Sequence, residues 1–148
     1  MKNLAAILFA LALSQSALAA DGLVTKASKH PVAATMDRIE NVAKEKGMTI
    51  FARIDHAAGA EKVGMKMPAA QVMIFGNPKG GTPLMLAAPS ASLDLPLRVA
   101  VWEDAQGMVW VGYNSVSFIK DRHAIGGKDE LVKTLDGTLD GITNKALE

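Results

Sequence analysis

The chain contains no cysteine, and its charges of opposite sign nearly balance, with 16 lysines and arginines against 15 acidic residues. Without cysteine it cannot form a disulfide, a thiolate metal site or a thiol nucleophile. It also has no basic arm or stripe, so we expect no nucleic-acid partner. These absences restrict the function to chemistry that needs neither a thiol nor a polyanion.

Long apolar runs are scarce too, and the single one lies at the N-terminus. Lys2 precedes an apolar stretch from Leu4 to Leu13 that is too short to cross a bilayer as a helix. Ala17-Leu18-Ala19 has the small-x-small pattern of a signal-peptidase site. We therefore predict a signal peptide over residues 1–19, cleaved after the last alanine, and one domain over residues 20–148. A retained N-terminal anchor is the alternative.

The predicted signal peptide also indicates where the protein is located in the cell. An exported chain without cysteine must be stable without disulfides, and the short leader is of a bacterial kind. We therefore expect a periplasmic protein, with secretion as the second choice. Because no second long apolar run follows, we expect no membrane contact once the leader is removed.

Hydrophobic periodicity predicts alternating strands and helices after the leader. The predicted strands cover residues 22–28, 48–55, 71–77, 97–103 and 108–114. The predicted helices cover residues 31–46, 57–63, 83–88, 118–125 and 129–147. Short connections between successive strands favour antiparallel pairing. We therefore predict an α+β domain, an antiparallel sheet of about five strands with helices packed on one face.

Several sequence blocks, in this order, resemble the domain-of-unknown-function family 302. They are Phe51-Ala52-Arg53-Ile54-Asp55-His56, Gly76-Asn77-Pro78-Lys79, Gly81-Thr82-Pro83-Leu84-Met85, Leu95-Pro96-Leu97-Arg98, Val101-Trp102-Glu103-Asp104 and Tyr113-Asn114. The resemblance covers residues 22–147. It implies a TATA-binding-protein-like, helix-grip arrangement, in which helices hold a curved antiparallel sheet, and it implies no particular activity.

The end of the second predicted strand collects a cation, an anion and an imidazole. Strand alternation places Arg53 and Asp55 on one face, with His56 at the turn that follows. One interpretation is a polar ligand site, or an enzyme that uses His56 as acid–base with Asp55 as its partner. The other is structural: Asp55 caps the next helix and pairs with Arg53.

The glycine-rich segment 76–82 is the second candidate. A strand, a glycine-rich loop and a helix N-terminus can present backbone N–H groups to an anion, assisted by Lys79 and Thr82. The alternative is a tight turn in which Thr82 caps a helix that begins at Pro83. The segment is not a P-loop, because Thr82 stands where the lysine belongs. We expect the ligand site where the second strand ends near this loop, with Asn77 and His123 close by.

Trp102 and Tyr113 lie on two strands joined by a turn over residues 104–107. They could line an apolar pocket between sheet and helices, or pack as ordinary core. No serine lies in the strand–Ser–helix elbow of hydrolases, so no catalytic triad is predicted.

Metal binding is a further alternative. Met65 and Met67 form a thioether pair of the kind that suits Cu(I), with histidines as added ligands, although methionines commonly fill core gaps. No two of the three histidines have zinc-ligand spacing.

The sequence thus favours a periplasmic module that binds a small, anionic ligand or interacts with a partner. We expect it to need no cofactor. Enzymatic and copper-binding functions remain alternatives, and a homodimer stays open. The predicted ligand-binding residues are Arg53, Asp55, His56, Asn77, Lys79, Thr82, Trp102, Tyr113 and His123.

Overall fold

The computed structural model describes residues 22–148, and the predicted leader lies outside the described residues. Its strands are β1 (Leu23–Ser28), β2 (Thr49–Asp55), β3 (Ala70–Gly76), β4 (Leu97–Glu103) and β5 (Val109–Asn114). Its helices are α1 (Val32–Glu45), α2 (His56–Glu61), α3 (Pro78–Ala87), α4 (Val116–Arg122) and α5 (Asp129–Leu147), with a 3-10 helix η1 (Pro89–Leu93). Within residues 22–148, no helix is both long and apolar enough to span a bilayer.

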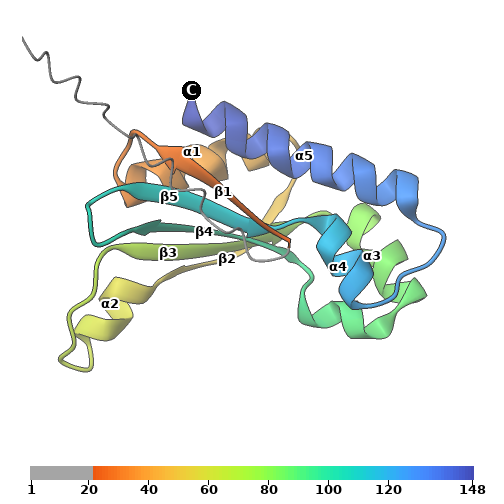
Figure 1. Cartoon of the computed structure of the whole chain (residues 1–148), viewed down its shortest axis with the longest axis horizontal. Helices are drawn as coiled ribbons and strands as arrows, with labels where there is room; N and C mark the ends of the chain where they lie inside the picture. Colours follow the sequence, from red (N-terminus) through yellow and green to blue (C-terminus); the bar gives the residue numbers. More distant parts are fainter. Residues whose placement is uncertain (1–21) are drawn as a thin grey trace, which may run out of the picture.

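The strands form one antiparallel sheet in the order β1-β5-β4-β3-β2. Helices α1 and α5 pack against each other over one face of this sheet (Figure 1). Helices α3 and α4 lie together at one end of the molecule and α2 at the other (Figure 1). The predicted α+β class and the five-stranded antiparallel sheet are confirmed.

The core lies between the sheet and the long helices. Along β4, Leu97, Val99 and Val101 are buried, and the residues between them face the other side of the sheet. Helix α1 contributes Met36 and Ile39, both fully buried. Burying an aliphatic side chain of this size contributes about 1.5–3 kcal/mol, so the apolar stripe of the helix fixes which face of the sheet it covers.

Strand β2 departs from the predicted alternation because it contains a bulge. Ile50 pairs with Phe75 and Ala52 pairs with Ile74, which leaves Phe51 without a partner on β3. Regular strand alternation would place Ile50 and Ala52 on one face, but they lie on opposite faces because their partners are adjacent residues that point to opposite sides. The bulge leaves Phe51 53% exposed.

Helix α3 begins at Pro78, well before the predicted start at Pro83. The Asn77 side chain caps it by accepting a backbone N–H from the first turn at 2.9 Å. Gly80 lies against α5, where an added Cβ would stand 2.8 Å from Cδ2 of Leu135. Gly80 therefore allows α3 to lie close to Leu135 of α5, and the prediction of a glycine-rich loop is wrong because the segment from Pro78 is helical.

The two short helices also begin earlier than predicted, because each has a side-chain cap. Asp55 accepts the N–H of Ala58 at the start of α2, and Ser115 accepts the N–H of Phe118 at the start of α4. The boundaries of the long C-terminal helix agree with the prediction.

Candidate functional site

The predicted site does not assemble, because its two halves lie at opposite ends of the β2–β3 hairpin. Asp55 pairs with Gln71 at the start of β3, whereas Thr49 pairs with Gly76 at its end. At about 3.3 Å per residue, these two ends are separated by roughly 17 Å along the strand. The residues thus kept apart are Arg53, Asp55 and His56 on one side, and Asn77, Lys79 and Thr82 on the other.

Arg53 holds the open edge of the sheet against α1. Its guanidinium donates to the carboxylates of Asp37 and Glu40, and its Nε donates to Gln71 Oε1 at 2.9 Å. The Gln71 amide in turn donates to Asp55 Oδ2 at 3.1 Å. The predicted direct pair between Arg53 and Asp55 is therefore replaced by a glutamine bridge, and all these groups are occupied within the fold.

Asp55 and His56 do not form an acid–base pair. Asp55 caps α2, and the Ala58 N–H that donates to its carboxylate at 2.9 Å holds the pKa of Asp55 below its usual value, aided by the Gln71 amide. His56 is exposed, and no hydrogen bond joins its ring to Asp55 within residues 22–148. The capping alternative for Asp55 is confirmed.

The open face of the sheet carries a hollow of about 270 Å³, which we call the Trp102 groove. Its lining residues are Leu23, Val72, Asp94, Leu97, Arg98, Ala100, Trp102, Gly112, Tyr113, Asn114 and Ile119. The Trp102 ring lies directly over Gly112, where an added Cβ would stand 2.6 Å from the ring. Arg98 donates to the carbonyl of Leu93 at 2.9 Å and has no carboxylate partner in the described chain. The groove therefore combines an indole face with an available cation.

Trp102 and Tyr113 both border this groove, but their side chains differ in direction. Trp102 pairs with Trp110 across β4 and β5, so both belong to the open face. Tyr113 follows Gly112 and turns to the other face, where its hydroxyl donates to Asp140 of α5 at 3.4 Å. Of the predicted aromatic pair, only Trp102 presents its ring to the groove.

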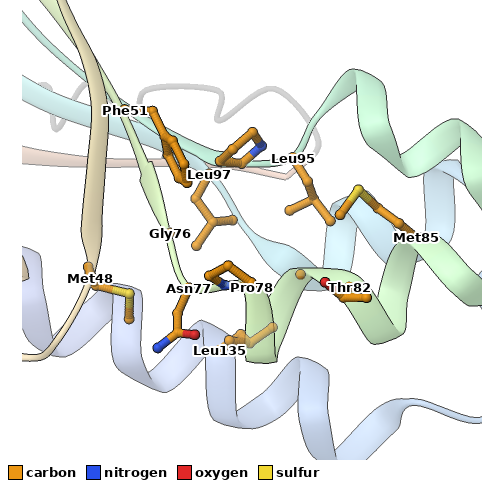
Figure 2. A pocket seen from close by; sticks show the side chains of 12 residues that line it. Met48, Phe51, Gly76, Asn77, Pro78, Thr82, Met85, Leu95, Leu97 and Leu135 are labelled. Carbon is orange, nitrogen blue, oxygen red and sulfur yellow. The ribbon is translucent and has the colours of Figure 1, made fainter.

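A second hollow of about 150 Å³ lies at the start of β2, and we call it the Phe51 cavity (Figure 2). It is lined by Met48, Phe51, Gly76, Asn77, Pro78, Gly81, Thr82, Met85, Leu95, Pro96, Leu97 and Leu135. Figure 2 shows these side chains converging from β2, α3, the segment before β4, and α5. None of the lining side chains is charged, and Asn77 already uses its amide oxygen to cap α3. The cavity is therefore suited to an apolar group.

Sequence reasoning selected only part of this cavity. It chose Asn77 and Thr82 as anion-binding residues, but both border an uncharged space, and Thr82 lies inside α3 instead of capping it. Lys79 lies in the first turn of α3, is exposed and does not line the cavity. The apolar lining was missed because methionine and leucine residues on four separate elements carry no local signal of a shared cavity.

His123, the last predicted residue, belongs to a different cluster. Its Nδ1 lies 2.9 Å from Ser90 Oγ, and its Nε2 lies 2.6 Å from Asp94 Oδ2. Sequence reasoning predicted no serine triad and missed Ser90 and Asp94, because both are far from His123 along the chain and lie outside any elbow motif. We call these three residues the Ser90 relay.

Met65 and Met67 lie in the connection between α2 and β3 and are 65% and 43% exposed. They are thus not core gap-fillers. Within residues 22–148, no group of three or more His, Cys, Asp and Glu side chains is placed to hold a metal ion. Copper binding by the two thioethers stays a prediction.

Part of this chain is similar to parts of curated proteins named as fluoride-specific ion channels. It is 43% identical over 115 residues to "Fluoride-specific ion channel FluC 1" of Brucella suis biovar 1 (strain 1330), a match over 77% of this chain and 45% of that protein. The same identity and length are found with "Fluoride-specific ion channel FluC 2" of Brucella melitensis biotype 1, of which 43% is matched. The chain therefore spans less than half the length of these relatives.

Structural and family comparisons agree on the fold. The "uncharacterized conserved protein DUF302 from Bacillus stearothermophilus" superposes with a TM-score of 0.76, covering 86% of this chain and 99% of that one. At 13% identity, this likeness shows the fold alone. The model of the family described as "Domain of unknown function DUF302" matches residues 24–142. The chain belongs to this family, as the order of its sequence blocks predicted.

Proposed function

We propose that the domain is a periplasmic binding module that takes a small apolar molecule, or the apolar end of a larger one, in the Phe51 cavity. The observation that carries this proposal is the uncharged lining of a space of about 150 Å³ with a 53% exposed phenylalanine at its edge. An apolar cavity of about this volume has room for a molecule about as large as benzene. A charged or strongly polar ligand would lose its hydration there without compensation.

The size of the cavity sets the expected affinity. Burying roughly 150 Å² of apolar ligand surface, at about 25 cal/mol per Å², favours binding by about 4 kcal/mol. Association and ordering oppose this gain, so we expect dissociation constants of about 1 mM or weaker for single-ring probes. A natural ligand that binds tightly would therefore extend beyond the cavity, across the exposed face of Phe51.

Filling the cavity from within tests the proposal. Gly81 lies in α3 with an ordinary backbone, and a Cβ there would meet only Met85 Cε, at 3.9 Å. Gly81→Leu should therefore occupy the space without breaking the helix. The matched control is Gly137→Leu, an exposed helical glycine with no neighbour within 4 Å of an added Cβ.

The probes are benzene, indole and toluene, and the readouts are thermal shift and ligand-observed NMR. Wild type and Gly137→Leu should both show stabilisation that depends on probe concentration, and Gly81→Leu should lose it. Binding that persists unchanged in Gly81→Leu, or no binding by wild type, would overturn the proposal.

Fluoride is a second candidate ligand, because the chain is 43% identical to a part of proteins named as fluoride-specific channels. We propose that the anion is held in the Trp102 groove by Arg98, which donates to the carbonyl of Leu93 but has no carboxylate partner among residues 22–148. The ¹⁹F NMR signal of fluoride should broaden with wild type and recover with Arg98→Ala. A signal that wild type leaves sharp would remove this candidate.

The proposed location has its own test. Periplasmic extracts should contain a protein whose N-terminus is Ala20, measured by intact-mass spectrometry after osmotic shock. A chain that retains Met1 in the membrane pellet would support the anchor alternative instead.

A further inference from the structure

The Ser90 relay connects two helical segments that are distant in sequence. Ser90 belongs to η1, Asp94 follows it directly, and His123 ends α4. The serine hydroxyl, the imidazole and the carboxylate form a continuous hydrogen-bonded chain, with distances of 2.9 Å and 2.6 Å. The second carboxylate oxygen is held by Arg122, whose Nη1 lies 3.2 Å away.

The chemistry of the three groups sets the direction of the hydrogen bonds. An ionised carboxylate can only accept, so the proton of a neutral imidazole must be on Nε2, facing Asp94. Nδ1 is then an acceptor, and the Ser90 hydroxyl donates to it. This is the tautomer in which the histidine can remove the serine proton, with the carboxylate positioned to stabilise the resulting imidazolium.

Of the three relay residues, only Ser90 is exposed. The side chains of His123 and Asp94 are 5% and 11% exposed, whereas Ser90 is exposed at the surface. The base and its carboxylate are thus shielded from water, and the hydroxyl remains accessible to a molecule from solvent. Asp94 also lines the Trp102 groove, so a molecule in that hollow would lie beside the relay.

We infer that Ser90 is a nucleophile activated by His123, and that it attacks small carboxylic esters or activated acyl compounds. Ser90 Oγ forms a bond to the carbonyl carbon while its proton passes to His123 Nδ1. The bond from that carbon to the alcohol oxygen then breaks, and the leaving alcohol takes the proton from Nδ1. Water attacks the acyl-serine in the same way, which releases the carboxylic acid and restores the serine. Asp94 acts as a positioning residue, through the histidine.

This activity is independent of ligand binding in the Phe51 cavity, which shares no residue with the relay. A lost cavity would leave the relay intact, and an inactive serine would leave the cavity intact. Failure of one proposal is therefore distinguishable from failure of the other.

Covalent labelling tests the inference directly. The chain is incubated with a fluorophosphonate and the modified residue is located by peptide mass spectrometry, while p-nitrophenyl acetate is used to follow turnover. The variants are Ser90→Ala, His123→Gln and Asp94→Asn. Ser92→Ala is the matched control, since Ser92 is an exposed serine of the same η1 without a histidine partner in the described chain.

We expect wild type and Ser92→Ala to be labelled at Ser90, and Ser90→Ala to carry no label. His123→Gln should label about 100-fold more slowly, the lower end of the contribution of a general base. Asp94→Asn should shift the pH profile of labelling, which a purely structural role would not do. Equal labelling of Ser90 and Ser92, or a rate unchanged by His123→Gln in a folded variant, would overturn the inference.

Discussion

Two pairs of aspartate and histidine in this chain invite comparison. Asp55 and His56 are adjacent in sequence, yet the aspartate caps α2 and the histidine is exposed. Asp94 and His123 are far apart in sequence, yet their side chains are 2.6 Å apart and largely shielded from water. Among residues 22–148, the pair that is adjacent in sequence forms no hydrogen bond between its side chains, whereas the pair that is distant in sequence does.

The difference has a physical origin. Neighbouring side chains on an extended strand point to opposite sides. At the end of β2, Asp55 accepts a hydrogen bond from the N–H of Ala58, one of the N–H groups at the start of α2 that have no partner within the helix. The second pair joins η1 to α4, and the contacts of Ser90 with His123 and of Arg122 with Asp94 join the same two segments. A hydrogen bond between their side chains, shielded from water, can therefore contribute to the fold as well as to chemistry.

The largest predicted effect is the difference in stability between a variant that lacks the Asp94 carboxylate and one that lacks the Asp55 carboxylate. Asp94→Ala leaves His123 without its acceptor and removes the contact with Arg122, so it should lower the free energy of unfolding by about 2–3 kcal/mol. Asp55→Ala removes a cap on an exposed helix and should cost clearly less. Urea unfolding followed by circular dichroism measures both.

The control for this measurement is Asp121→Ala, an exposed aspartate of α4 near His123. It should leave stability within about 0.5 kcal/mol of wild type. If Asp94→Ala and Asp55→Ala destabilise the protein equally, the contrast drawn between the two pairs is wrong.

This contrast also shows what the sequence could predict. Periodicity found the five strands and the long helices, because burial of an apolar face repeats at fixed intervals along each element. The capping role of Asp55 was one of two interpretations that the sequence left open, and it could be proposed because a cap is a local signal. Periodicity could not find the bulge at Phe51, the cavity or the Ser90 relay. Each of these depends on which distant segments meet, and one sequence carries no local mark of that.

The next prediction concerns the pH dependence of Asp55. Its pKa is lowered in the folded protein by the Ala58 N–H, so the cap stabilises the fold fully above pH of about 4, the usual range of aspartate. The stabilisation is lost as the pH falls through the lower, folded value. Asp55→Asn keeps a capping side chain without this titration, so its stability should decline less as the pH falls below about 4.

Thermal unfolding at stepwise pH measures this slope. Glu61→Gln is the control, because it removes an exposed carboxylate from the same helix, and it should leave the slope as in wild type. An acid decline in Asp55→Asn as steep as that of wild type would show that the cap does not titrate as described.

The smallest effect is expected for a substitution of His56, and it provides a direct contrast with the substitution of His123. His56 is exposed and makes no side-chain hydrogen bond within residues 22–148, so His56→Ala should change the free energy of unfolding by less than about 0.5 kcal/mol. It should also leave the rate of fluorophosphonate labelling unchanged, whereas His123→Gln slows it. The two variants each remove one imidazole from the same protein, so nonspecific reaction of surface histidines with the reagent cannot explain a difference between them. Equal effects of the two variants on labelling would mean that the geometry around His123 has no chemical consequence.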